Sequence, residues 1–177
     1  MNTCSNQYNI LKELNQLHAV IDSAIAFIEL NSIKNLSPEF ILRIKWVLTE
    51  LCSNTYKHSS SSNALLEILI QQEQIILRVS DKGNVFDITQ FINTGMQSFA
   101  NGIHKIRLCD YGFLSLHAQF SEQRHLLFST EEANNNINIE SLNEHYGLLI
   151  ITRACDEFTY TYHEHTNTNE FNAILKY

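Results

Sequence analysis

Residues 37–58 carry the pattern that most restricts how this chain can fold. Apolar residues recur there at spacings of three and four, which predicts an α-helix with one buried stripe that runs to about His58. The stripe consists of Phe40, Ile44, Val47, Leu48 and Leu51. Ser37 stands where it can cap the first turn, and Pro38 occupies the first helical position, so the start of the helix is well defined.

The rest of the chain alternates between helical and extended patterns. Helical spacing recurs over residues 14–30 and 147–155. Strand patterns predict three antiparallel pairs, which are 64–71 with 74–80, 113–120 with 125–130, and 156–164 with 169–177. A short first strand over 9–13 and an exposed loop over 134–136 complete the prediction. We expect one domain over residues 1–177, because the length suits a single core.

Charge and composition disfavour several classes of function. The formal net charge of −7 argues against a nucleic-acid binder and against docking on anionic lipid, since both need a basic surface. The chain has no long uncharged apolar run, so we expect no membrane association. Its four cysteines are scattered and form no CxxC pair, which is typical of a reduced, cytoplasmic protein.

Three polar residues share one face of the helix over residues 37–58. Glu50, Asn54 and Lys57 follow each other at spacings of four and three, at the edge of the apolar stripe. A carboxylate there can accept a proton, an amide oxygen can bind Mg²⁺, and an ammonium can balance phosphate charge. The alternative is an ordinary solvated helix face, which often has this composition.

Two further segments add chemistry to this face. Asp81 and Gly83 end a strand pattern, where the carboxylate can accept a hydrogen bond from an exocyclic amine and the glycine lets the backbone approach a planar ring. Gly147 precedes an apolar helical run, so the helix start can receive phosphate oxygens. The alternatives are a plain Asp-x-Gly turn and a plain helix start.

The order of these three segments resembles the GHKL, or Bergerat-fold, ATPases. Residues 49–58 look like the N box of that family, and residues 81–87 look like its first glycine box. In the latter, Asp-x-Gly followed by Phe-Asp is closest to the anti-sigma-factor serine kinases. Residues 146–160 are similar to the second glycine box and the elements after it, and residues 169–176 to the closing strand.

The resemblance implies a two-layer α/β (α+β) sandwich with ATP or ADP and Mg²⁺ between the layers. The sheet would be mixed and mostly antiparallel, with helices packed on one face. Glu50 would be the general base and Asn54 would bind the Mg²⁺ that accompanies the nucleotide. Lys57 and Gly147 would lie near the phosphates. At the end of the site opposite the phosphates, Asp81 would recognise the adenine amino group.

Two further assignments at the base end also follow from the resemblance. Gly83 would lie beside the adenine ring, and Thr168 would lie on the adenine side just before the last strand. The implied function is an ATP-binding regulator that holds a sigma factor or phosphorylates a serine on an antagonist protein, as a homodimer. Serine/threonine kinase activity is thus one possibility, and a non-catalytic interaction module with degenerate nucleotide binding is the other.

The sequence departs from the family pattern at the phosphate end. Gly147 is the one glycine in the second glycine box, because His145 stands where the family usually has another. The segment over residues 88–146, where the family has its lid, is enlarged. It could hold a hairpin that extends the sheet or a partner surface. Three phenylalanines in it are expected to form a small additional core: Phe113, Phe120 and Phe128.

Overall fold

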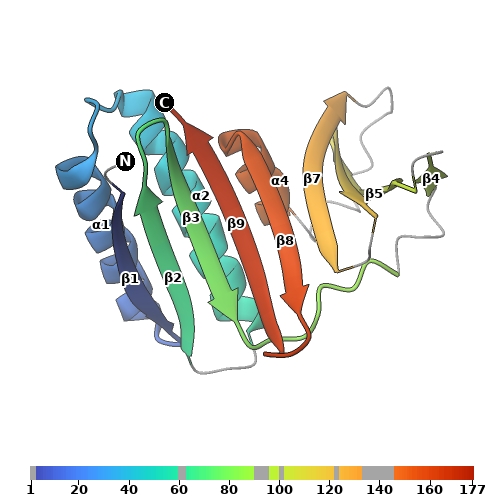
Figure 1. Ribbon diagram of the computed structural model, residues 1–177, viewed down its shortest axis with the longest axis horizontal. Coiled ribbons are helices and arrows are strands. Elements are labelled where there is room, and N and C mark those ends of the chain that lie inside the picture. Colours follow the sequence, from blue (N-terminus) through green and yellow to red (C-terminus); the bar gives the residue numbers. More distant parts are fainter. Residues whose placement is uncertain (1–2, 60–62, 90–95, 100–101, 122–123, 133–145) are drawn as a thin grey trace.

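The computed structural model describes residues 3–59, 63–89, 96–99, 102–121, 124–132 and 146–177. Within these ranges the chain is a mixed α/β protein with three helices and one large antiparallel sheet (Figure 1). The strands are β1 (Cys4–Leu11), β2 (Asn63–Ile70), β3 (Gln74–Asp81), β4 (Gln97–Ser98), β5 (His104–Tyr111), β6 (Leu114–Phe120), β7 (His125–Glu132), β8 (Glu157–His163) and β9 (Thr168–Lys176). Their order in the sheet is β1-β2-β3-β9-β8-β7-β6-β5-β4.

The three helices are α1 (Leu14–Asn31), α2 (Pro38–His58) and α4 (Tyr146–Ala154). Figure 1 shows that they lie on the same side of the sheet. The start of α2 is the predicted one, because the Phe40 amide donates to Ser37 Oγ at 3.2 Å and Pro38 follows the cap. No helix within the described ranges is long and apolar enough to cross a membrane.

The core lies between the helices and the sheet. The predicted stripe of α2 is buried there, together with alternate residues of β3, namely Ile75, Leu77 and Val79. Asp81 occupies the next inward position of β3, so strand periodicity carries a carboxylate into the helix-facing layer. This polar residue at the end of an apolar row is the first structural sign of a site.

The segment over residues 88–146 extends the sheet. Its strands β4, β5, β6 and β7 continue the sheet beyond β8, and the predicted hairpin over 113–120 and 125–130 is confirmed as β6 and β7. Phe120 and Phe128 are buried, but they belong to the main core cluster of the described residues and form no separate small core. The expectation for Phe113 is wrong: its side chain is 79% exposed, because it follows Gly112, whose φ of 59° turns the chain between β5 and β6.

Of the other strand predictions, two pairs are confirmed and the bounds of the first strand are corrected. The pairs β2 with β3 and β8 with β9 are confirmed. The first strand is longer and earlier than the predicted 9–13, because Cys4–Leu11 pairs along its whole length with β2. Every ladder between described strands is antiparallel, so the mostly antiparallel sheet is confirmed and no parallel pair is seen in the described part. The predicted loop over 134–136 lies outside the described residues.

Candidate functional site

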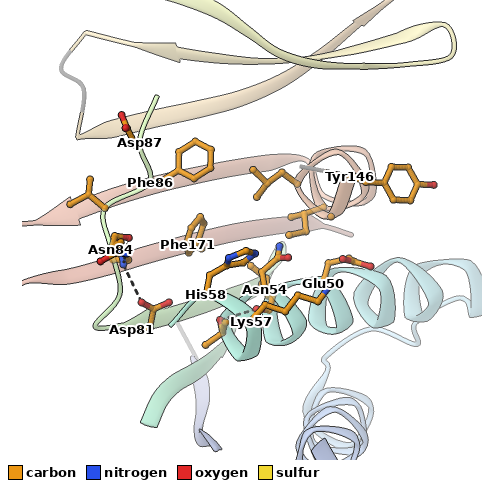
Figure 2. Close-up of a pocket in the computed structure, with 17 residues that line it drawn as sticks. Glu50, Asn54, Lys57, His58, Asp81, Asn84, Phe86, Asp87, Tyr146 and Phe171 are labelled. Carbon is orange, nitrogen blue, oxygen red and sulfur yellow. Dashed lines mark hydrogen bonds between the residues drawn. The ribbon is translucent and has the colours of Figure 1, made fainter. Parts of the chain in front are cut away.

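A cavity of about 830 Å³ opens between α2, α4 and the ends of β3 and β9. Figure 2 shows the polar residues of α2 in a row, with Asp81 and Asn84 beyond the end of that row. The cavity is lined by five of the seven residues singled out in the sequence: Glu50, Asn54, Lys57, Asp81 and Gly147. Segments nearly one hundred residues apart in the chain therefore meet around one space.

The face of α2 that lines the cavity is the predicted polar ridge. Helical spacing turns Glu50, Asn54 and Lys57 to this side, while Leu51 and Thr55 beside them are buried and fix the helix in place. His58 ends the row, next to Asp81. The ridge therefore presents a carboxylate, an amide and an ammonium to one cavity.

Gly147 brings the start of α4 against this ridge. A Cβ at Gly147 would come within 2.6 Å of Glu50 Oε2, and within 3.2 Å of both side-chain polar atoms of Asn54. Any other residue would therefore push against these two side chains. The glycine allows the backbone of α4 to approach the residues that the resemblance assigns to catalysis and Mg²⁺.

Asp81 lies at the opposite end of the cavity from Glu50 and is 7% exposed. Burial raises the pKa of its carboxyl above the ordinary value. Hydrogen bonds from the Asn169 side chain and the Gly83 backbone amide lower the pKa and partly offset that effect, as does the positive potential of His58. A buried carboxylate with fixed donors is the kind of group that recognises a polar ligand edge.

Gly83 and Thr168 lie outside the described lining of the cavity. Gly83 nevertheless borders the site, because a Cβ there would meet Asp81 Oδ1 at 2.8 Å, and because Gly83 forms an isolated antiparallel bridge with Ser59 at the end of α2. Thr168 bonds locally instead, with its hydroxyl donating to the Thr166 carbonyl at 3.2 Å. Successive strand residues face opposite sides, so the residue that enters the site is Asn169.

Sequence reasoning missed Asn169 and the aromatic wall of the cavity. Asn169 stands opposite Asp81 in the β3–β9 ladder, a pairing that joins residues 88 positions apart. Phe86 and Phe171 line the cavity, and both rings contact the buried Tyr160, with centroids 5.8 and 4.9 Å away. The alternation of aromatic residues in β8 was a usable signal for Tyr160. No pattern in the sequence pointed to the pairing of Asp81 with Asn169.

The described lining carries more negative than positive charge. Glu50, Asp81 and Asp87 are carboxylates, and Lys57 is the one ammonium among the described lining residues. No group of three His, Cys, Asp or Glu side chains within the described ranges could hold a metal ion by itself. A divalent cation at this site would therefore need ligands from the bound molecule, as Mg²⁺ commonly does with phosphates.

Neither a scan against protein-family models nor a search of curated proteins finds a match to this chain.

Proposed function

We propose that this cavity binds an adenine nucleotide, ATP or ADP, together with Mg²⁺. The observation that carries the proposal is the convergence of Asp81, the Glu50-Asn54-Lys57 ridge and Gly147 around one space of about 830 Å³. The chemistry differs between its two ends: a buried acceptor with aromatic neighbours at one, and charged and amide groups with a close helix start at the other. A nucleotide has the same division into a planar base and a polyphosphate.

The end near Asp81 suits a purine base. The carboxylate would accept a hydrogen bond from the adenine amino group, and Phe86, Phe171 and Ile151 offer apolar surface to the ring faces. Gly83 keeps the chain close to Asp81 without a side chain in the way.

The end near Glu50 suits phosphates with a divalent ion. The Asn54 amide oxygen would complete the coordination of a Mg²⁺ held mainly by phosphate oxygens, and Lys57 would offset their charge. Glu50 would accept the proton of an attacking hydroxyl group. The bound ion would supply the charge neutralisation that phosphoryl transfer needs.

We infer that the fold is the two-layer Bergerat type, with β4–β7 inserted where the family has its lid. The single-sided placement of the helices and the meeting of the three sequence boxes support this assignment. By resemblance, the protein is a regulator like the anti-sigma-factor serine kinases. It would be a homodimer in the cytoplasm that binds a sigma factor or phosphorylates an antagonist protein.

A second candidate function is a non-catalytic interaction module on the same fold. The excess of carboxylates in the described lining favours it, because phosphates are repelled by such a surface unless a cation is present. In this case the inserted strands would bind a protein partner and nucleotide binding would be weak.

Calorimetric and thermal-shift titrations with Mg²⁺-ADP test the proposal. Ligand at about 100 times the dissociation constant should stabilise the fold by about 2.7 kcal/mol. Asp81→Asn should weaken binding at least roughly tenfold, because the amide can present a donor where the base also donates. Asp22→Asn on the distant helix α1 is the control and should bind as the wild type does. If the wild type shows no stabilisation, the interaction module is the better description.

Glu50→Ala separates binding from chemistry. Without the proposed base, the variant should keep its affinity for Mg²⁺-ADP and lose transfer of the γ-phosphoryl group from ATP to water, followed as formation of ADP and phosphate. Glu39→Ala, in the first turn of the same helix and exposed, should change neither quantity. Turnover of Glu50→Ala at the wild-type rate would remove Glu50 from the mechanism.

A further inference from the structure

A continuous chain of hydrogen bonds leads from the buried face of β8 to Asp81. The Tyr160 hydroxyl donates to Asn169 Oδ1 at 2.8 Å, and Asn169 Nδ2 donates to Asp81 Oδ1 at 3.1 Å. The Tyr160 side chain is 0% exposed and Asn169 is 3% exposed. Because these side chains are buried, their hydrogen bonds are not exchanged for bonds to water, and the positions of the bonded groups are fixed.

The same two side chains also hold the segment that follows β3. Asn169 Nδ2 donates a second bond to the Asn84 carbonyl at 3.2 Å, and the Phe86 backbone amide donates to the Tyr160 hydroxyl at 2.9 Å. The Asn169 amide therefore uses its nitrogen for two acceptors and its oxygen for one donor. This arrangement allows one orientation of the amide, because a flipped amide would oppose oxygen to the Asp81 carboxylate.

The consequence for Asp81 is a fixed carboxylate. Asn169 and the Gly83 backbone amide both donate to it, and the remaining acceptor positions of a carboxylate, which has about four in all, are left for a ligand in the cavity. The close contacts of Gly83 reinforce this, since a Cβ there would meet Asp81 Oδ1 at 2.8 Å and Asn169 Nδ2 at 3.2 Å. Side chains at position 83 would break the arrangement.

We propose that Asn169, oriented by Tyr160, is the positioning residue of this cavity, fixing the Asp81 carboxylate as an acceptor for a 6-amino purine and against a 6-oxo purine. The inference rests on the proposed nucleotide binding. Inosine diphosphate (IDP) differs from ADP by an oxygen in place of the amino group, so it would place an acceptor against the fixed acceptor of Asp81. A carboxylate free to rotate or take up a proton would discriminate less.

The first test is the ratio of IDP to ADP dissociation constants, measured by calorimetry. The wild type should prefer ADP at least roughly tenfold, and Asn169→Leu should bring the ratio close to one. Asn172→Leu is the matched control, because it makes the same change on the opposite face of β9, and it should keep the wild-type ratio. If Asn169→Leu weakens both nucleotides equally and keeps the ratio, the residue is only structural and the proposal fails.

Tyr160→Phe provides a second variant that keeps the shape of the core. It removes the hydroxyl that orients Asn169, so the IDP-to-ADP ratio should fall part of the way towards one. Tyr162→Phe is its control, since the Tyr162 hydroxyl bonds to Asn167 outside the chain of bonds. A wild-type ratio in Tyr160→Phe would show that the tyrosine does not orient Asn169, against the proposal.

A measurement without nucleotide separates this inference from the proposed function. The Asp81 carboxyl can be titrated by carbon-13 NMR in the free protein. Loss of the Asn169 donor should raise the Asp81 pKa in Asn169→Leu and leave it unchanged in Asn172→Leu. If the wild type binds neither ADP nor IDP, the proposed function falls, and this titration alone decides whether Asn169 positions Asp81. An unchanged pKa in Asn169→Leu overturns the proposal.

Discussion

Folding shifts the pKa values of two aspartates a few residues apart in opposite directions. Burial raises the pKa of Asp81, whereas hydrogen bonds from the Thr89 hydroxyl and amide lower the pKa of the exposed Asp87. A raised pKa in the folded state means that ionisation opposes folding. The stability contributed by protonated Asp81 is therefore full below the ordinary pKa of an aspartate and is lost as the pH rises through the raised value.

The direction in which stability changes with pH can be checked by urea unfolding between about pH 3 and pH 7. Relative to the wild type, Asp81→Asn should become more stable as the pH rises, because it removes a charge that is costly to bury. Asp87→Asn should behave in the opposite way. Its wild-type carboxylate stabilises the fold above the ordinary aspartate pKa and ceases to do so as the pH falls through the lowered value. If the stabilities of the two variants changed with pH in the same direction, the opposite pKa shifts of Asp81 and Asp87 would be refuted.

Two neighbouring residues of β9 show why side-chain roles could not be predicted from the sequence alone. Thr168 and Asn169 are neighbours with similar polarity, yet one bonds locally and the other enters the cavity. Their roles depend on the register between β3 and β9, and a shift by one residue would exchange them. No local pattern specifies that register, because the two strands are far apart in the chain.

At the scale of elements, α2 and α4 depend on a glycine where they meet. Gly147 lies in the first turn of α4, where alanine would favour the helix by up to about 1 kcal/mol. Its position against Glu50 and Asn54 explains why the smaller residue is useful there. Packing and helix propensity thus oppose each other at this position.

Gly147→Ala should therefore separate stability from function. We expect the free energy of unfolding to change by less than about 1 kcal/mol, because Glu50 can swing away and the helix gains propensity. The affinity for Mg²⁺-ADP should fall at least roughly tenfold, because the new Cβ displaces the Asn54 amide, which is the proposed ligand of Mg²⁺. Thr152→Ala, on the same helix and outside the described lining, should bind as the wild type does. Unfolding in urea and calorimetry provide the two measurements, and unchanged affinity in Gly147→Ala would show that Asn54 does not hold the ion that accompanies the nucleotide.

Elements with regular periods were predictable and an irregular one was not. The apolar stripe predicted α2, and β-rich runs separated by short polar links predicted the pair of β2 with β3 and the pair of β8 with β9. The strand β5 escaped prediction because its register shifts between Arg107 and Cys109, which interrupts the alternation of buried and exposed residues.

At the scale of the whole molecule, the inserted strands reach the border of the cavity. Tyr111, at the end of β5, packs on Tyr146 at the start of α4, with ring centroids 4.8 Å apart. Tyr146 lines the cavity and Gly147 follows it. Strand β5 therefore contacts the end of the cavity that holds Glu50 through this pair of aromatic rings. The order of strands that creates this connection arises from long-range pairing, so sequence patterns predicted three antiparallel pairs and not the order in which they join into one sheet.

The central place of β9 also orders events during synthesis. It joins β1-β2-β3 to the block that runs from β8 to β4, and it supplies Asn169 to the cavity. While β9 is missing from the nascent chain, β1-β2-β3 and the block from β8 to β4 can form only as separate half-sheets, each with a bare edge where β9 will insert. The nascent polypeptide can neither close its sheet nor complete its pocket until that final strand emerges from the exit tunnel.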